Sequence, residues 1–357
     1  MTGRERMARI LARKPVDRIG LFEHFWSDTM RTWSEQGHIG GDEMPSDHFG
    51  FDCDLCWALD FTADLDFVPE TVEETEETIL RRDGNGALLR WNKHHDGTPE
   101  HVGFRVTDRT GWEESIRDRL TPDPRRIGFE GYRRARAHHA AKDRFFFLAA
   151  INVFEQMFPV CGHENLLVGM ALDPDWVREM AETYADLSIA LMEILFEREG
   201  PPDGIFFYED MGFKQHPFFS PAAYRELLQP AHRRTIAFAK SRGLPVVMHS
   251  CGYVAPLVPN LVEAGIDCLQ VIEVKAGMDL LALHRDFGDR LSFMGGIDAR
   301  ILASGDPDAL ERELVSKIPA VKQGFGYVVH SDHSIPSTVD YAFYRRFADR
   351  ALELGRY

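Results

Sequence analysis

The sequence predicts a single (β/α)8 TIM barrel over residues 1–357, with a small β-hairpin insertion at 66–112. Two observations predict this fold. In the second half of the chain, buried-strand patterns alternate with amphipathic helix patterns, and such repeats form parallel sheets with helical crossovers. Five of these units and three earlier strands make the eight that a closed barrel needs. A dinucleotide-binding fold is not indicated, because no Gly-x-Gly-x-x-Gly follows an early strand.

The composition is that of a chain with ample material for a large core: 357 residues, 44% hydrophobic and 27% charged. A net charge of −16 argues against binding to nucleic acid. No apolar run approaches the ~20 residues of a membrane helix, and the N-terminus has no apolar signal segment. The five cysteines are scattered, which favours reduced thiols. We therefore expect a cytoplasmic enzyme.

The first part of the chain supplies a candidate pocket rim. A helix is expected at 2–14, a strand at 19–22 and a helix at 28–38. The strand is followed by a mixture of polar and aromatic residues, from which we predict substrate contacts by Phe22, His24 and Trp26. A simpler interpretation of His24 is an edge histidine. The pair Cys53 and Cys56 forms a lone C-x-x-C without a second pair, so we expect it to be structural.

Residues 66–112 differ from the rest of the chain in composition and in the pattern of expected elements. The segment 71–80 is acidic and β-branched, and 82–87 contains a Gly-Asn-Gly turn typical of a hairpin. Further strands are expected at 88–91 and 101–107. His94 and His95 lie in a Gly/Pro/Asp-rich loop, where exposure is a better expectation than metal binding.

From residue 112 onward, helices and strands alternate, and nearly every predicted strand ends in a polar residue. Helices are expected at 130–141, 174–199 (capped by Asp173), 221–242, 254–264, 279–287, 307–322 and 337–354. The residues at the strand ends are Glu155, Glu209, Asp210, His249, Cys251, Glu273, Asp298, His330, Asp332 and His333. Active sites of TIM barrels form at the carboxyl ends of the strands. The gathering of these polar and ionisable residues at the carboxyl ends of the strands predicts an enzyme.

The segment His249-Ser250-Cys251-Gly252 suggests a metal site. Residues two apart on a strand point to the same face, and imidazole nitrogen and thiolate sulfur are preferred zinc ligands. His333, after the last strand, opens on the same barrel mouth and could supply a third ligand. Three protein ligands leave one tetrahedral position open, as in catalytic zinc sites. Alternatively, His249 and Cys251 pack at a strand end, and His330 and His333 bind substrate carboxylates.

The sequence resembles the uroporphyrinogen decarboxylase superfamily, and most closely its cobalamin-dependent methyltransferase branch. The resemblance runs from Arg4 to the C-terminal helix. Its most specific motifs are Tyr208-Glu209-Asp210-Met211, His249-Ser250-Cys251-Gly252, Glu273 to Asp279, Gly295-Gly296-Ile297-Asp298, and Gly326 to Val329 with Ile335-Pro336. The thiol-methylating members hold zinc with a histidine and a cysteine of such an H-x-C-G and with a second cysteine. The position that resembles the second cysteine is His333, so the resemblance implies zinc ligation by His249, Cys251 and His333.

Three functions follow as hypotheses. The first is a zinc-dependent methyltransferase that moves a methyl group between a corrinoid on a partner protein and a small thiol. Glu209, Asp210 and Glu273 would orient the substrate or accept its proton, and Phe22, His24, Trp26, Glu155, Asp298 and His330 would contact it. The second is a metal-free lyase acting on a carboxylated substrate, although 20–26 lacks the arginine-rich motif of the decarboxylase proper. The third is a corrinoid- or porphyrin-binding module without catalysis. The sequence leaves open whether the chain forms a homodimer.

Overall fold

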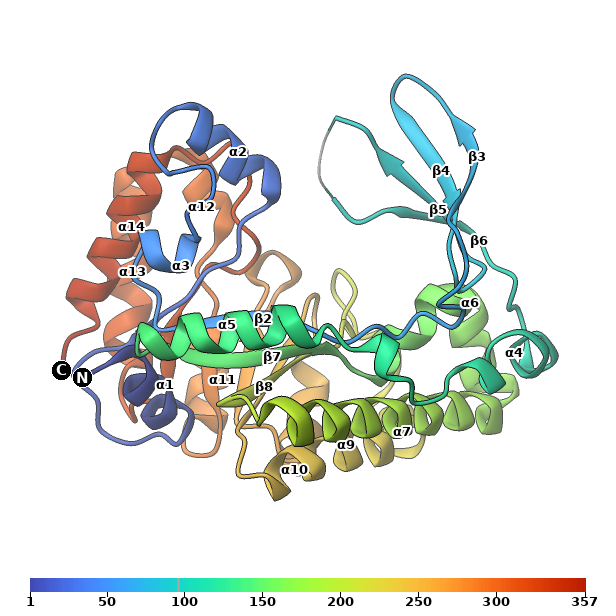
Figure 1. Cartoon of the computed structure of the whole chain (residues 1–357). Helices are drawn as coiled ribbons and strands as arrows, with labels where there is room; N and C mark the ends of the chain where they lie inside the picture. The colour runs from blue at the N-terminus through green and yellow to red at the C-terminus, as the bar shows by residue number, and fades with distance from the viewer. Residues whose placement is uncertain (95–96) are drawn as a thin grey trace.

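Eight parallel strands form the central sheet of the computed structural model, which describes residues 1–94 and 97–357 (Figure 1). The strands are β1 (Gly20–Leu21), β2 (Cys53–Trp57), β7 (Phe145–Ile151), β8 (Gly204–Tyr208), β9 (Val246–Ser250), β10 (Cys268–Val271), β11 (Ser292–Gly295) and β12 (Tyr327–Val329). Their order in the sheet is β1-β12-β11-β10-β9-β8-β7-β2. The predicted TIM-barrel fold is confirmed, and each sequential β/α unit places its strand beside the previous one.

Asp52 joins the two end strands of this sheet. Its backbone N–H donates to the carbonyl of Leu21 at 2.9 Å, and its carboxylate accepts the N–H of Leu21 at 2.8 Å. Arg6 and Arg18 bind the same carboxylate. The Asp52 side chain is only 2% exposed, so its charge needs these partners. The contact brings the beginning of β2 beside β1 and curls the sheet into a barrel.

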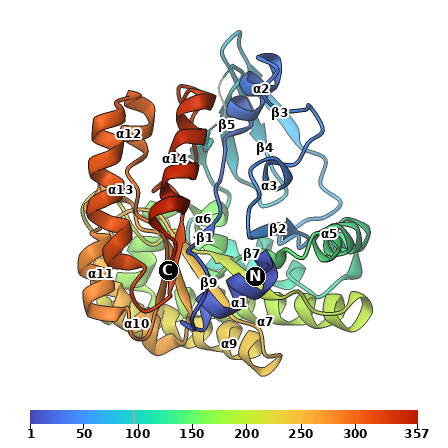
Figure 2. The ribbon, with the colours of Figure 1, turned by 90° about the vertical axis from the view of Figure 1, so that its left-hand side faces the viewer.

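Helices surround the barrel, and most of them cover its outer face (Figure 2). They are α1 (Gly3–Leu11), α2 (Ser27–Glu35), α3 (Pro45–His48), α4 (Arg109–Ser115), α5 (Phe129–Ala141), α6 (Val153–Leu172), α7 (Pro174–Glu199), α8 (Pro221–Ala223), α9 (Gln229–Ser241), α10 (Val258–Ala264), α11 (Leu280–Phe287), α12 (Ala299–Ser304), α13 (Pro307–Val321) and α14 (Tyr341–Leu354). The predicted cap of α7 is present, because the Asp173 side chain accepts the N–H of Trp176. Strands such as β7 are buried along almost their whole length, as expected for a parallel sheet covered by helices.

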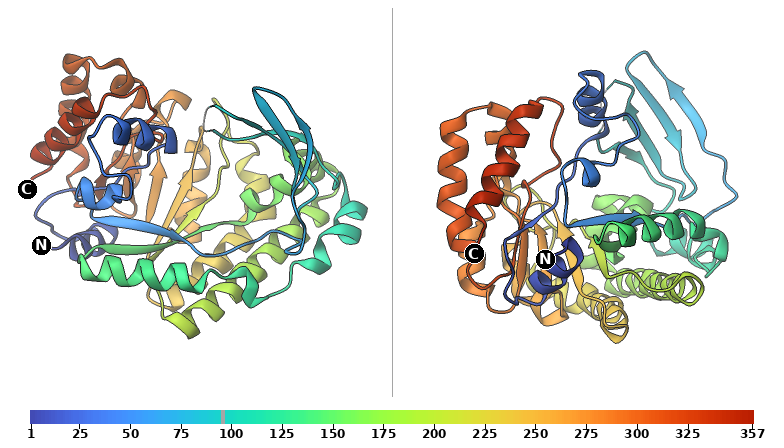
Figure 3. Two further views of the ribbon diagram at one scale, coloured as in Figure 1. Left: turned by 45° about the horizontal axis from the view of Figure 1, so that its top comes forward. Right: turned by 60° about the vertical axis from the view of Figure 1, so that its left-hand side comes forward.

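A second, antiparallel sheet follows β2, where the β-rich insertion was predicted. It contains β3 (Glu70–Glu74), β4 (Thr78–Arg82), β5 (Leu88–Asn92) and β6 (Glu100–Gly103), in that order. Figures 1 and 3 show that it stands over the same side of the barrel as α2. Both segments follow the carboxyl ends of barrel strands, so both stand at the mouth. His94 is exposed, as expected, whereas His95 lies outside the described residues.

The strand predicted at 101–107 is shorter than expected, because β6 ends at Gly103. The next residue, Phe104, turns out of the sheet and packs against Gly162, where α6 departs from helical geometry. Gly162 has a φ of +78°, and a Cβ there would lie 2.4 Å from the Phe104 ring. Only glycine tolerates both the backbone conformation and this approach. The contact fastens the second sheet to α6.

Among the described residues, we find no helix that combines the length and the apolar character needed to cross a membrane.

Candidate functional site

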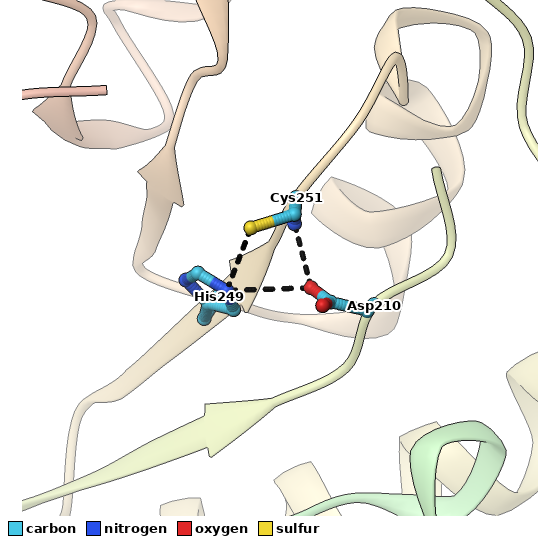
Figure 4. Close-up of side chains that lie close together, drawn as sticks. All are labelled: Asp210, His249 and Cys251. Carbon is cyan, nitrogen blue, oxygen red and sulfur yellow. Dashed lines mark hydrogen bonds and ion pairs between the residues drawn. The ribbon is translucent and has the colours of Figure 1, made fainter. Parts of the chain in front are cut away.

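Three side chains with metal-binding atoms meet at the carboxyl ends of β8 and β9 (Figure 4). The Nε2 atom of His249 lies 3.3 Å from the Sγ atom of Cys251 and 3.3 Å from the Oδ1 atom of Asp210. All three candidate ligand atoms lie within 4.8 Å of one another. The residues are Asp210, His249 and Cys251, and we call them the metal-ligand cluster. The sequence predicted the His/Cys pair but gave Asp210 a different role.

The donor set and spacing of the cluster fit zinc. Zinc bonds of about 2.0–2.3 Å in a tetrahedron place neighbouring ligand atoms about 3.3–3.8 Å apart. The two separations of 3.3 Å from His249 Nε2 match this value. The Asp210 side chain is 37% exposed, which leaves one side of the cluster open to a further ligand. The cluster offers one nitrogen, one sulfur and one oxygen donor, all of them ligand types that zinc accepts, and three protein ligands with an open position are typical of a catalytic zinc site.

Electrostatics couple the three groups to one another. Burial alone would lower the pKa of His249, but Cys251 and Asp210 raise it well above its usual range. Burial would likewise raise the pKa of Asp210, whereas the hydrogen bond and charge of His249 lower it on balance. Burial raises the pKa of the Cys251 thiol. A bound cation would compensate the same anionic groups that His249 compensates here.

The turn that carries Cys251 is held from both sides by carboxylates. Its backbone N–H donates to Asp210 Oδ1 at 2.7 Å, and the next N–H, of Gly252, donates to Glu273 Oε2 at 2.7 Å. Gly252 has a φ of +78°, and a Cβ there would lie 2.3 Å from the carbonyl carbon of Gly212. The glycine of the H-x-C-G segment is therefore required by backbone packing. It lets the segment after β8 pass directly beside Cys251.

A buried hydrogen-bond network extends from His249 across the interior of the barrel, and we call it the barrel-floor network. The Nδ1 atom of His249 meets Oε1 of Gln270, whose Nε2 lies 3.3 Å from Nε2 of His330. His330 Nε2 also lies 2.9 Å from Nδ1 of His24. The hydroxyl of Tyr208 lies 2.9 Å from Nε2, the other nitrogen of His24. His24 and His330, predicted as substrate contacts, thus bind each other in the interior.

Burial keeps both floor histidines neutral. Burial, with His330, His249 and His333 nearby, lowers the pKa of His24 well below its usual range. Burial lowers the pKa of His330 to about 3. Below His330, the Glu23 carboxylate is fully buried and accepts the N–H and the hydroxyl of Ser331. Burial nevertheless raises the pKa of Glu23 to about 8.

Glu155 and Glu209, two of the predicted acids, occupy different environments. Glu155 is partly exposed and accepts the N–H of Asp210 at 2.8 Å, next to the metal-ligand cluster. Burial and the Asp210 carboxylate raise its pKa to about 8. Glu209 is fully buried and accepts the N–H groups of Phe154 and Glu155 at the start of α6. Its remaining partner is His232 of α9, so Glu209 faces the helices and not the mouth.

His333 lies beside the cluster and outside it. Its ring packs against Trp26, with centroids 5.9 Å apart. Both residues line a cavity of about 280 Å³ together with Glu273, Lys275 and Arg300, among others. Because Glu273 also binds the turn after Cys251, this cavity adjoins the cluster. Glu273, Trp26 and His333 therefore share one cavity next to the metal-ligand cluster.

Two further residues that the sequence predicted as substrate contacts, Phe22 and Asp298, have other partners in the structure. Phe22 is 2% exposed and packs in the core against Phe206. Asp298 caps α12 by accepting the N–H of Arg300 and also pairs with its guanidinium.

Cys53 and Cys56 are buried free thiols, and burial raises the pKa of Cys56 to about 11, in agreement with a structural role.

Sequence reasoning missed Gln270 and Trp57. Gln270 lies inside β10 and is fully buried, so the signal available was a polar side chain within an apolar run. Trp57 ends β2, is 55% exposed and packs over Tyr208 with ring centroids 4.8 Å apart. A large exposed aromatic at a strand end was the signal for this residue.

The general class is therefore a TIM-barrel protein in which a histidine, a cysteine and an aspartate meet at the carboxyl ends of the strands. Comparison with known families makes this specific. The chain belongs to the uroporphyrinogen decarboxylase (URO-D) family, whose model matches residues 146–354, more than half of the chain.

Individual relatives agree with this assignment. A methylated-thiol–coenzyme M methyltransferase from Methanosarcina mazei is 26% identical over 166 residues, which are 45% of this chain and 42% of that protein. The match thus spans less than half the length of this relative. A solved structure of a methyltransferase from Methanosarcina mazei has a TM-score of 0.69 at 16% identity, covering 99% of this chain and 98% of the other. At this identity the second comparison shows the shared fold alone.

Proposed function

We propose that the protein is a zinc-dependent methyltransferase that moves a methyl group between a corrinoid carrier and a small thiol. The observation that carries this proposal is the cluster of Asp210, His249 and Cys251 at the barrel mouth. The name of the relative from Methanosarcina mazei, a methylated-thiol–coenzyme M methyltransferase, supports a thiol as the acceptor. The corrinoid carrier, on a partner protein, follows from the family resemblance.

In this proposal, different residues of the site bind the metal and position its ligands. His249, Cys251 and Asp210 would hold the metal, and a bound metal would lower the pKa of a coordinated thiol so that its sulfur is nucleophilic at neutral pH. Glu155 holds the backbone of Asp210, and Glu273 holds the turn after Cys251. The thiol proton leaves to solvent through the open side of the cluster. The sulfur–carbon bond forms as the methyl group leaves its carrier, which keeps the electron pair.

The acceptor lies in the cavity beside the cluster. Its wall offers the flat faces of Trp26 and His333 and the ammonium group of Lys275. The Lys275 ammonium lies 3.7 Å from Glu273 Oε1 and the Arg300 guanidinium is paired with Asp298, so both cationic side chains of this lining already have a carboxylate partner. The lining therefore suits a small thiol better than a polycarboxylate, which would need several unpaired cations. This feature favours methyl transfer over the lyase alternative.

A direct test combines elemental analysis with a transfer assay. Purified protein is expected to hold one zinc per chain and to form methyl thioether from methylcobalamin and a panel of small thiols. Cys251→Ala is expected to lose both the zinc and the activity. Cys56→Ala, which removes a buried thiol outside the cluster, serves as the matched control and is expected to keep both.

Two outcomes would contradict the proposal. One is a purified protein that holds no stoichiometric metal and whose metal content is unchanged by Cys251→Ala. The other is release of CO₂ from a carboxylated substrate by the chelator-treated protein, which would establish the lyase alternative.

A further inference from the structure

We propose that Gln270 and His330 are positioning residues that fix which nitrogen of His249 faces the metal. This inference rests on the metal site proposed above and adds two residues to it. Neither touches the cluster through its own donor atoms. They act through the hydrogen-bond directions of the barrel-floor network, which can be followed from one end to the other.

The first step is to decide which ring nitrogen of His330 carries the proton. Its Nδ1 atom meets the backbone carbonyl of Ser331, which can only accept a hydrogen bond. Nδ1 therefore carries the hydrogen. His330 is 1% exposed, and burial lowers its pKa to about 3, so the ring is neutral and holds a single proton. Its Nε2 atom is left with a lone pair that must accept.

The second step is the orientation of the Gln270 amide. His330 Nε2 lies 3.3 Å from Nε2 of Gln270 and 2.9 Å from Nδ1 of His24, and an acceptor atom on either neighbour would oppose its lone pair. Gln270 therefore turns its NH₂ group to His330 and its carbonyl oxygen to His249. The reversed amide would oppose the carbonyl oxygen and the lone pair of His330. Gln270 is fully buried, so water offers no replacement partner.

The third step is His249 itself. Because the Gln270 oxygen can only accept, the Nδ1 atom of His249 carries a hydrogen. Its Nε2 atom then faces Cys251 and Asp210, where the metal needs a lone pair. His249 and Gln270 are register partners on β9 and β10, so the strands fix their separation. Metal-binding histidines commonly depend on such a partner for their tautomer and ring orientation.

The test compares variants by zinc affinity, measured in competition with a chromophoric chelator at pH 7.5. Gln270→Leu removes the acceptor and is expected to weaken zinc binding by about 10–100-fold. Gln270→Glu, as the neutral acid, keeps an acceptor toward His249 and a donor toward His330, and it is expected to stay within about threefold of the parent protein. Gln229→Leu is the matched control, because Gln229 is also buried and bonds the carbonyl of Asn260 away from the cluster. Its affinity is expected to be unchanged.

The role of His330 is tested by rescue. His330→Phe frees the Gln270 amide to turn over and is expected to weaken zinc binding about tenfold. The double variant His330→Phe/Gln270→Glu is expected to recover that loss, because a carboxylate presents an accepting oxygen in either orientation. A purely structural role for His330 would give no rescue. Parent-like affinity in Gln270→Leu, or an equal loss in Gln229→Leu, would overturn the proposal.

A second readout keeps this inference separable from the proposed function. In metal-free protein with ¹⁵N-labelled histidine, the Nδ1–H of His249 is expected as a slowly exchanging resonance that His249→Gln removes. It is expected to persist in Gln270→Glu and to disappear in Gln270→Leu. If the parent protein binds no zinc, the proposed function fails, while this resonance still decides the hydrogen-bond assignment. Its absence from the parent protein would refute the inference.

Discussion

The side-chain carbonyl of Gln270 accepts the Nδ1–H of His249 across two neighbouring strands, β9 and β10. This contact joins the metal-ligand cluster at the mouth to the neutral histidines of the barrel floor. Two residues that the sequence suggested as substrate contacts, His24 and His330, belong to this floor. The polar strand ends therefore do not all face one cavity: His24 and His330 contact each other in the interior, whereas Asp210, His249 and Cys251 form the cluster at the mouth.

The identity of the third ligand is the first prediction. Asp210→Asn keeps the size of the side chain and removes its charge, and we expect zinc affinity to fall by at least about 100-fold, more than outer-shell changes cause. His333→Gln is the matched variant, and we expect it to retain one zinc per chain, because His333 lies outside the cluster. Elemental analysis and chelator competition measure both. The reverse result would support the ligand set that the family resemblance implies: His249, Cys251 and His333.

The second prediction concerns stability and pH. Burial raises the pKa of Glu23 to about 8, although Ser331 donates two hydrogen bonds to it, with the neutral His330 and the carboxyl of Asp332 nearby. In the unfolded chain this carboxyl ionises near its ordinary pKa of about 4.3. Between that pH and 8 the folded state binds more protons than the unfolded state, so stability falls as pH rises.

The size of this effect is on the order of 3 kcal/mol between pH 5.5 and pH 8.0. Urea unfolding at pH 5.5 and 8.0 measures it, with Glu23→Gln as the comparison, because the amide cannot ionise. We expect the parent protein to lose stability relative to Glu23→Gln as pH rises. A constant difference between the two proteins at both pH values would show that Glu23 is ionised throughout.

The third prediction separates two acids that the sequence placed together. Glu209 is fully buried and binds His232 and the start of α6. Removing one partner of such a network costs about 3 kcal/mol, so we expect Glu209→Ala to lower the free energy of unfolding by that amount. Glu155→Gln, at the mouth beside Asp210, is expected to reduce methyl transfer with a smaller loss of stability. Equal effects of both variants on stability and turnover would contradict this division.

The strand ends were predictable from the sequence because buried apolar runs stop where the backbone reaches the mouth. Eight strands and the position of the cluster on β8 and β9 follow from that pattern. Period-two alternation could also have separated Glu209 from Asp210: Tyr208 lies in the barrel against His249, so Glu209 points outward and Asp210 inward. Sequence alone could not give the partners of Gln270 or the place of His333, since both depend on side-chain packing between distant strands.

The last prediction concerns the glycine of the H-x-C-G segment. Gly252 and Gly243 have similar left-handed backbones, with φ of +78° and +73°. A Cβ at Gly243 meets nothing within 4 Å, whereas at Gly252 it would lie 2.3 Å from the backbone of Gly212. We expect Gly243→Ala to cost about 1–2 kcal/mol, the strain of the backbone conformation alone. Gly252→Ala adds the overlap, about 1–3 kcal/mol further.

The same overlap acts on the metal site. Relief of the clash requires the Cys251 turn or the Gly212 segment to move, and Cys251 is bonded to Asp210 through its backbone N–H. Gly252→Ala is therefore expected to lose zinc at temperatures where it remains folded, while Gly243→Ala keeps it. Thermal unfolding followed by circular dichroism and zinc content after gel filtration distinguish the two. Full zinc content in folded Gly252→Ala would mean that the position of Cys251 is not set by this packing.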